Sequence, residues 1–473
     1  MTARRTPDLV VIGSGPGGYR AAVLGALRGL KVALVEQGVW GGTCLNRGCV
    51  PKKAWYATAR LVAANAHFAE RGLAGRLTPD LGAAWRHQRS VVDAVRASYR
   101  DYLDRLGVTA LSGRATLLPG RRVEVAGHGV LSPGAIVVAT GSSPSVPAGL
   151  ALHPGRVLTS DELFDAPPPA GRRVALLGSG VIGTEMAFIL TMLGCEVTWL
   201  VQSEPLARAG FTPPARAALR AALAGHGVSP RRAGRLRACA VDAGGVTLQL
   251  ADGTTERADW VLAASGRRPN VAGIGLDAAG VALGADGFVA TDDRTMTAAP
   301  GVYAIGDCAN PRMTSNHALA EAAVAIADIV APGSALRDPD AVPAVVYSAL
   351  ELARVGWSEA RAEEAERDPA TGFASLQSSP AALAGGDARG FVRVVADLES
   401  GALLGAEAVG AHAGEWIHVA GAALRAPDGL ARLARARYNH PSLAEEVLNA
   451  TETLAAKWGL GERIFAPGPG ARE

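Results

Sequence analysis

One pattern occurs twice in this chain: an apolar strand that runs directly into G-x-G-x-x-G and then into a helical stretch. The first copy covers residues 10–18 and the second covers residues 174–183, and their first glycines lie 165 positions apart. A single copy is weak support for a nucleotide site, whereas two copies in a strand–turn–helix context are strong support. Glycines let the backbone approach a pyrophosphate, and the helix N-terminus offers the phosphates partial positive charge. We therefore predict two nucleotide-binding units, with the cofactor-binding glycines Gly13, Gly15 and Gly18 in one and Gly178, Gly180 and Gly183 in the other.

The residue that ends the second strand of each unit differs between the two copies. Glu36 lies 23 positions after Gly13, where a carboxylate can accept hydrogen bonds from an adenosine ribose. The equivalent position of the second copy is Val201, followed by Gln202. The first unit is therefore predicted to hold an unphosphorylated ribose, as in FAD or NAD. In the second unit NADP would require a nearby cation, for which Arg208 is the close candidate, so NAD and NADP both remain open.

Two cysteines, Cys44 and Cys49, follow the first nucleotide-binding unit. In a regular helix their Cα atoms would be roughly 8.6 Å apart, beyond the limit of about 7 Å for a disulfide. A Cys44–Cys49 bond therefore requires an irregular helix start, which Gly48 and the flanking pair 41–42 permit. A redox-active cysteine pair just downstream of a bound flavin is the core of a disulfide oxidoreductase. The alternative is a pair of buried structural cysteines.

Length and charge narrow the class of protein further. A chain of 473 residues is long enough for about three domains, each with its own core. The net charge of +3 and the absence of a long basic run give no reason to expect nucleic acid or an anionic membrane as a partner. Five mostly isolated cysteines do not form a secreted disulfide scaffold, and we expect no metal site. No signal peptide or membrane-spanning apolar run is recognised, so a cytoplasmic soluble enzyme is expected.

A histidine near the C-terminus stands in a defined context. Pro441 suits the first turn of a helix and forces His440 into an extended conformation. Glu445 has two interpretations. In one, the segment 442–445 is a capping box in which Glu445 returns to the backbone N–H of Ser442. In the other, Glu445 orients and polarises His440, so that the imidazole takes up or delivers a thiol proton.

Several further segments surround the two units. Residues 83–107 carry apolar side chains at helical spacing and predict a long amphipathic helix. Residues 167–169 and 331–343 have the composition of linkers. Three other apolar strands end in a glycine motif, where the chain would cross between nucleotide domains or place an acid near a ribose or ribityl hydroxyl. The candidate residues at these strand ends are Thr140, Gly141, Gly266, Arg267, Gly306 and Asp307.

Together these motifs resemble those of the class I pyridine nucleotide–disulfide oxidoreductases, the flavoprotein family of dihydrolipoamide dehydrogenase, glutathione reductase and mercuric reductase. The resemblance covers roughly residues 6–455, with the motifs in family order. It implies an α/β fold with two Rossmann-like nucleotide-binding domains, for FAD and NAD(P), and a C-terminal α+β dimerisation domain. The implied domains are residues 1–150 (first part of the FAD-binding domain), 151–268 (NAD(P)-binding), 269–340 (second part of the FAD-binding domain, central) and 341–473 (interface).

The resemblance also implies roles for individual residues. Cys49 would be the thiol beside the flavin, and Cys44 the thiol that exchanges with substrate. His440 and Glu445 would form an acid–base pair that reaches the flavin site of a partner subunit, so the resemblance implies a homodimer. Asp307 would bind the ribityl or phosphate region of the flavin. The remaining implied cofactor contacts are Gly42 and Thr43, and the ion pair of Lys52 or Lys53 with Glu185.

The substrate is predicted as a small dithiol or disulfide. Dihydrolipoamide dehydrogenase is the first choice, with the lipoyl group on a carrier protein as one form of substrate, because the segments 41–46 and 440–443 are similar to that branch. A glutathione reductase-like enzyme is close behind, since residues 50–53 and 445–446 look more like that branch. Mercuric reductase fits less well, because no cysteine follows Cys308. A non-catalytic flavin redox sensor is the alternative from another class.

Overall fold

The computed structural model describes residues 6–465 of the chain. It divides into two compact units. The first contains the chain up to Ala57, Asp80–Ala175 and Arg235–Arg337, and the second contains Thr58–Pro79, Leu176–Gly234 and the chain from Asp338 onward.

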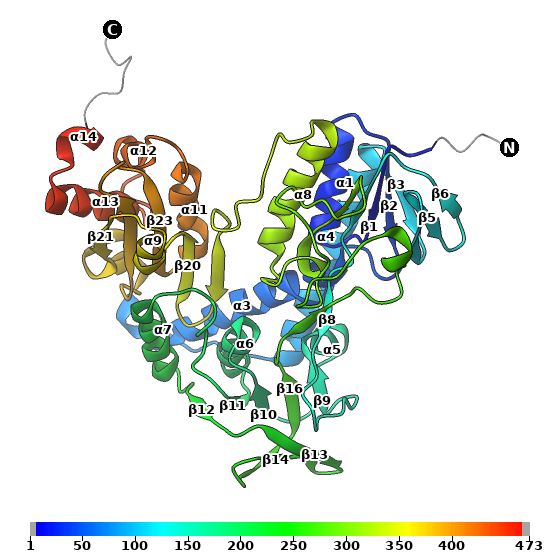
Figure 1. The fold of residues 1–473 in the computed structure, drawn as a ribbon. Coiled ribbons are helices and arrows are strands. Elements are labelled where there is room, and N and C mark those ends of the chain that lie inside the picture. The colour runs from blue at the N-terminus through cyan, green and yellow to red at the C-terminus, as the bar shows by residue number, and fades with distance from the viewer. Residues whose placement is uncertain (1–5, 466–473) are drawn as a thin grey trace. The chain divides into compact units, whose positions relative to one another are not determined.

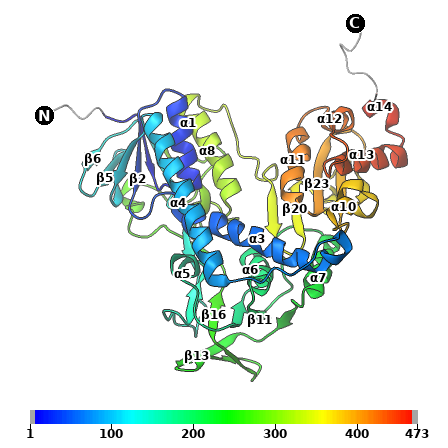
Figure 2. The same cartoon turned by 180° about the vertical axis from the view of Figure 1, so that it is seen from behind.

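The first unit is built on a five-stranded parallel sheet. Strand β1 lies at its centre and all four of its apolar residues are buried, as expected for a strand covered on both faces. Helices α1 (Pro16–Leu27) and α8 (Ser315–Val330) lie side by side against the sheet (Figure 1), and the long helix α4 (Leu81–Arg105) belongs to the same unit (Figure 2). The strand order is β18 (Val302–Ala304), β7 (Ala135–Val138), β1 (Leu9–Ile12), β2 (Val32–Glu36) and β3 (Thr109–Ser112).

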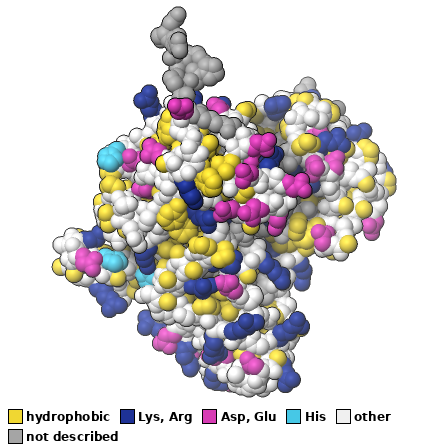
Figure 3. Space-filling model, turned by 60° about the vertical axis from the view of Figure 1, so that its left-hand side comes forward, with side chains coloured by type: hydrophobic (Ala, Val, Ile, Leu, Met, Phe, Trp, Pro, Cys, Tyr) yellow, Lys and Arg dark blue, Asp and Glu magenta, His cyan; other side chains and the backbone are white. Residues whose placement is uncertain are grey.

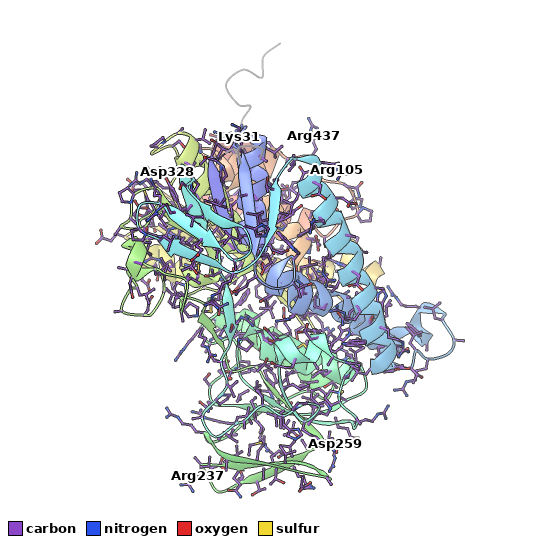
Figure 4. All side chains as sticks on the ribbon, turned by 90° about the vertical axis from the view of Figure 1, so that its right-hand side faces the viewer. Lys31, Arg105, Arg237, Asp259, Asp328 and Arg437 are labelled. Atoms are coloured by element: carbon purple, nitrogen blue, oxygen red, sulfur yellow. A yellow bond between two sulfur atoms is a disulfide. The ribbon has the colours of Figure 1, made fainter. Side chains whose placement is uncertain are left out.

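Smaller antiparallel elements complete this unit. One three-stranded sheet contains β4 (Ala115–Leu118), β5 (Arg122–Val125) and β6 (Gly129–Leu131), and another contains β13 (Leu236–Asp242), β14 (Gly245–Leu250) and β15 (Thr255–Ala258). Strands β8 (Ser142–Pro144) and β17 (Arg267–Pro269) pair as a two-stranded ribbon. Asp259, just after β15, accepts hydrogen bonds from the Arg173 side chain and from the N–H groups of Arg172 and Arg173. Asp328, on α8, accepts a hydrogen bond from Tyr303, and both aspartates are labelled in Figure 4.

The second glycine motif lies in another five-stranded sheet. Its order is β12 (Pro230–Arg232), β11 (Glu196–Val201), β10 (Arg173–Leu177), β16 (Trp260–Ala263) and β9 (Val157–Thr159). Strand β10 leads through Gly178 into helix α6 (Val181–Met192), which repeats the β1–α1 arrangement of the first sheet. Helix α5 (Ser160–Asp165) follows β9, and helix α7 (Pro213–Gly225) follows β11.

The C-terminal part is a mixed α+β layer with its own apolar core. Its antiparallel sheet has the order β19 (Ala344–Tyr347), β20 (Glu351–Gly356), β23 (Leu403–Gly410), β22 (Phe391–Asp397) and β21 (Pro369–Ser375). Strand β23 is buried along its whole length. The helices of this part are α9 (Glu359–Glu364), α10 (Pro380–Gly385), α11 (Ala413–Ala423), α12 (Gly429–Arg435), α13 (Glu445–Trp458) and α14 (Gly461–Phe465).

The predicted fold class is confirmed, with local corrections. The amphipathic helix expected at 83–107 is α4, which begins two residues earlier because the Asp80 side chain accepts a hydrogen bond from the Ala83 N–H. The helix expected to start near Pro441 begins only at Glu445. Within residues 6–465, no helix combines the length and the apolar character needed to cross a membrane. The face in Figure 3 carries basic side chains scattered among acidic and apolar ones.

Candidate active site

Cys44 and Cys49 form a disulfide on either side of a break between two helices. Helix α2 (Gly42–Arg47) contains Cys44, and helix α3 (Cys49–Ala63) begins at the second cysteine. Gly48 between them has φ −135° and ψ −107°, outside the helical region. This break brings the two Cα atoms to 4.8 Å, well within disulfide range. The irregularity predicted from the spacing is therefore confirmed.

Helix α2 packs directly on the first glycine turn. Gly42 has φ +62°, and a Cβ at this position would lie 2.5 Å from the Cα of Gly15. The turn is fixed by Ser14, whose Oγ accepts a hydrogen bond of 2.9 Å from the Gly41 N–H. Ser14 donates in turn to Glu36 through both its N–H and its hydroxyl group, at 2.9 and 2.7 Å. The cysteine segment and the glycine motif thus form one structural piece.

The starts of helices α1 and α6 are suited to hold phosphates. Their N-cap residues are Gly15 and Gly180, and neither helix has a side-chain cap. Helices α4, α5, α7, α8, α9 and α10 are each capped by an Asp, Thr or Ser side chain, while α2, α11, α12 and α13 also have no side-chain cap. Only α1 and α6 follow a glycine motif of the dinucleotide-binding type. The unpaired N–H groups at the start of α1 and α6 therefore stay available for an anionic ligand. This arrangement fits the pyrophosphates of two dinucleotides.

The two glycine motifs share one geometry. The N–H of Gly13 bonds the Val35 carbonyl at 2.8 Å, and the N–H of Gly178 bonds the equivalent Leu200 carbonyl at 3.1 Å. A Cβ at Gly18 would lie 1.8 Å from the carbonyl oxygen of the first glycine of its motif, and a Cβ at Gly183 would lie 2.3 Å from the corresponding oxygen. These last glycines are required for helix–strand packing, whereas a Cβ at Gly180 would meet nothing within 4 Å and one at Gly15 would meet only the Cα of Gly42, at 4.0 Å.

Residues at the ends of the glycine-ending strands are linked by hydrogen bonds in the first unit. Thr140 donates its hydroxyl to the Asn270 carbonyl at 2.7 Å, and the Asn270 N–H bonds Gly141 at 2.9 Å. Asp307, in the turn after β18, accepts a hydrogen bond of 2.6 Å from Ser142. The structure thus brings Thr140, Gly141, Gly266, Arg267, Gly306 and Asp307 together around the β8–β17 ribbon and the neighbouring ends of β7 and β18.

Two polar residues that the sequence patterns did not single out support this region. Glu321, on α8, is buried and accepts hydrogen bonds from the Gly306 N–H at 2.7 Å and from Asn310 at 2.6 Å. Burial raises the pKa of Glu321, and these donors partly counteract that effect. Ser315, the first residue of α8, places its Oγ 3.3 Å from the Sγ of Cys49. Its distance of 266 positions from Cys49 explains why no local motif reveals it.

The second motif has an exposed end beside Val201. Val201 is buried, while Gln202 and Arg208 are exposed. Ser203 bonds Ser179 of the glycine turn at 2.9 Å, and Glu204 is ion-paired with Arg216 and Arg220. The structure thereby keeps the loop after β11 close to the glycine turn.

Glu185 lies on the buried face of α6. Its carboxylate accepts a hydrogen bond of 2.9 Å from the N–H of Tyr347, at the end of β19. Lys52 and Lys53 lie near the start of α3, half-buried. Their ion pair with Glu185 stays a prediction.

His440 and Glu445 form a hydrogen-bonded pair, with 3.0 Å between Nδ1 and Oε1. The other carboxylate oxygen accepts the Ser442 N–H at 2.7 Å, which is the hydrogen bond expected of Glu445 in a capping box. The proton-transfer role of the His440–Glu445 pair stays a prediction. The capping box is incomplete, because α13 starts at Glu445 and the Ser442 hydroxyl has no hydrogen-bond partner among the described residues. The Ser442 N–H, and then His440, hold the pKa of Glu445 below its usual range. The imidazole is 73% exposed.

Comparison with known proteins agrees with this geometry. Residues 7–327 match the pyridine nucleotide-disulphide oxidoreductase family, and residues 342–451 match its dimerisation domain. The chain therefore belongs to the pyridine nucleotide–disulphide oxidoreductases, in their class I, whose members use FAD and NAD(P)H.

Two relatives with assigned activities represent two branches of the family. The chain is 36% identical over 457 residues to a dihydrolipoyl dehydrogenase of Thermus scotoductus, covering 95% of this chain and 98% of the relative. It is 34% identical over 448 residues to a glutathione reductase of Burkholderia cepacia, covering 93% and 97%. Among solved structures, LpdA of Mycobacterium tuberculosis superposes with a TM-score of 0.88 at 25% identity, over 94% of this chain and 99% of that one. The chain is thus a flavoprotein disulfide oxidoreductase.

Proposed function

We propose that this oxidoreductase is a dihydrolipoamide dehydrogenase that passes electrons from a dihydrolipoyl group to a nicotinamide coenzyme. The observation that carries the proposal is the Cys44–Cys49 disulfide in a segment packed on the first glycine turn. The similarity to dihydrolipoyl dehydrogenases over nearly the whole chain supports the choice of substrate. We further propose that the enzyme is cytoplasmic and that its substrate includes a lipoyl group on a carrier protein.

The bound FAD and nicotinamide coenzyme supply two-electron hydride chemistry to this site. The chain would hold the flavin with the uncapped start of α1, with Glu36 at the ribose and with Asp307 at the ribityl region. It would hold the coenzyme with the uncapped start of α6 and the exposed residues beside Val201.

The proposed thiol chemistry rests on four side chains. A substrate thiolate attacks the Sγ of Cys44, the Cys44–Cys49 bond breaks, and Cys49 leaves as a thiolate. The second substrate thiolate then displaces Cys44, so that the substrate becomes a cyclic disulfide and both cysteines are reduced. His440 accepts the substrate thiol proton, and Glu445 fixes the imidazole tautomer through Nδ1.

A steady-state assay of the purified holoenzyme tests this proposal. Dihydrolipoamide would be offered with NAD⁺ and NADP⁺, and lipoamide and oxidised glutathione with NADH and NADPH. We expect reduction of NAD⁺ by dihydrolipoamide, abolished in Cys44→Ser and lowered by about 10²–10⁴-fold in His440→Gln. Turnover confined to NADPH and glutathione would assign the enzyme to the glutathione reductase branch, which Arg208 favours through its exposed charge. A flavin-containing protein that is silent with every pair would support the redox-sensor alternative.

A further inference from the structure

Helix α2 contains Cys44, one of the two cysteines of the redox disulfide, but has few interactions of its own that stabilise it. It has six residues, no side-chain cap, a left-handed glycine before it and a non-helical glycine after it. Isolated helices of this length are unstable in water. After reduction the covalent link between Cys44 and Cys49 is also lost. Two residues between the cysteines, Asn46 and Arg47, make polar contacts with other helices and hold α2 in place.

On one side, Asn46 fixes α2 to helix α4. Asn46 is buried, and its Nδ2 donates to the carbonyl groups of Trp40 and Gly42 at 3.0 and 2.8 Å. Its Oδ1 accepts two hydrogen bonds from the Arg96 guanidinium, at 3.0 and 2.6 Å. Arg96 is in turn paired with Asp93 at 3.0 Å.

On the other side, Arg47 fixes α2 to helix α5. Its Nε lies 2.7 Å from Asp165, and its Nη1 lies 4.0 Å from Asp161. The Arg47–Asp165 pair is partly exposed, with 38% and 43% of the side chains accessible, while Asp161 is only 14% accessible. Burial raises the pKa of Asp161, and Arg267 is the main group that opposes this. The ionised form of Asp161 therefore depends on Arg267.

Arg267 joins this carboxylate to the region expected to hold the flavin. Its Nη1 lies 3.2 Å from Asp161, while its Nε donates to Ser142 Oγ at 2.7 Å and its Nη2 donates to the Ser142 carbonyl at 2.8 Å. The Ser142 hydroxyl donates to Asp307 at 2.6 Å. A continuous chain of polar contacts thus connects the turn after β18 with helix α2. Its members, in order, are Asp307, Ser142, Arg267, Asp161 and Arg47.

We propose that Asp161 is a positioning residue that couples flavin binding at Asp307 to the disulfide equilibrium of Cys44 and Cys49. The proposal rests on the flavin role given to Asp307 above. Loss of Asp161 frees Arg47 from one carboxylate and leaves Arg267 with Ser142 alone. Both changes affect the disulfide–dithiol equilibrium. Helix α2 is held less firmly, so the two thiols are kept close together less strongly. The charge of Arg47 is also less neutralised, and it stabilises a thiolate. Both favour the dithiol form.

Two measurements on the holoenzyme test the coupling. The disulfide is equilibrated with a dithiol reductant, which becomes a cyclic disulfide as it passes two electrons and two protons to Cys44 and Cys49, and the free thiols are counted by alkylation and mass spectrometry. Flavin retention is followed by flavin fluorescence on dilution. For Asp161→Asn we expect a two- to fivefold shift towards the dithiol and about tenfold weaker flavin retention.

Asp165→Asn is the matched control, because it lies on the same helix and contacts Arg47 but has no contact with Arg267 among the described residues. It should shift the thiol equilibrium and leave flavin retention unchanged. Arg267→Lys is the second variant, since one ammonium group replaces the guanidinium fork that holds Ser142 and Asp161 together. It should change both measurements, and it keeps the test valid if Asp161→Asn does not fold.

Flavin retention in Asp161→Asn equal to that of Asp165→Asn would overturn the coupling, as would an unchanged thiol equilibrium. The wild-type protein separates this outcome from failure of the proposed function. If it binds flavin and shows a titratable disulfide while the variants behave alike, only the coupling is wrong.

Discussion

Cys49 faces two features that stabilise a thiolate after reduction. The Ser315 hydroxyl lies 3.3 Å from its sulfur, and Ser315 is the first residue of the 16-residue helix α8. A hydrogen bond to the charged form and the positive end of a helix both lower a thiol pKa. We expect Ser315→Ala to move the alkylation of Cys49 to higher pH, because the thiolate loses a hydrogen-bond donor.

The pH dependence of Cys49 alkylation in the reduced protein measures this shift. Ser90→Ala on α4 is a suitable control, because its hydroxyl group donates to a carbonyl of its own helix, that of His87. An unchanged alkylation profile in Ser315→Ala would show that the hydroxyl does not interact with the thiolate.

Glu445 makes a pH-dependent contribution to stability. Its pKa is lower in the folded protein than in the unfolded chain, because the folded state supplies the Ser442 N–H and His440 as donors. The stabilisation is therefore complete above the ordinary carboxyl pKa of about 4.3 and is lost as the pH falls through the lower folded value. Glu445→Gln should unfold more easily than wild type at pH 7 and match it once the pH is below the lowered pKa of the folded state. Urea unfolding across this range measures the difference, and a gap that persists in acid would contradict the electrostatic explanation.

At the scale of elements, the last glycine of the second glycine motif has a packing role. A Cβ at Gly183 would meet the Gly178 carbonyl at 2.3 Å, whereas one at Gly225, the last residue of α7, would meet nothing within 4 Å. We expect Gly183→Ala to cost about 1–3 kcal/mol by overpacking and Gly225→Ala to be neutral or stabilising by up to about 1 kcal/mol. Denaturant unfolding compares the two variants, and equal stability would contradict the packing role of Gly183.

Sequence patterns predict single helices, strands and turns better than the contacts between them. The glycine turns, the strands leading into them and helix α4 follow from local periodicity and turn chemistry, as does the need for a break between Cys44 and Cys49. Ser315, Glu321 and Asp161 could not be found in this way, because each acts on a partner brought near by the sheet topology. The predicted start of this helix is wrong, because Pro441 suits a first helical turn but Glu445 is the first residue of α13.

At the scale of the whole molecule, the dimerisation domain predicts a complex of two copies, with a mass about twice the 48.3 kDa of one chain. In the proposed arrangement, His440 of one chain serves the cysteines of the other. Mixed dimers of Cys49→Ser and His440→Gln chains would then contain one complete site each. Random mixing should restore about a quarter of wild-type turnover, because half of the dimers are mixed and each has half of its sites intact.

Sedimentation gives the mass, and the assay after subunit exchange gives the recovered activity. No recovery in a sample shown to contain mixed dimers would mean that each chain completes its own site. A monomer with full activity would exclude the shared site altogether.

The contacts of Asn46 and Arg47 that hold helix α2 in place affect how another molecule can recognise this region. Asn46 and Arg47 fix the helix through contacts that contain no sulfur, so we expect its surface to keep one shape whether or not the two cysteines are joined. An inhibitor or antibody fragment that recognises only the contour of this surface should bind the oxidised and the reduced enzyme with equal affinity. An inhibitor that is selective for one of the two forms would have to react with sulfur, because the shape of the surface does not distinguish them.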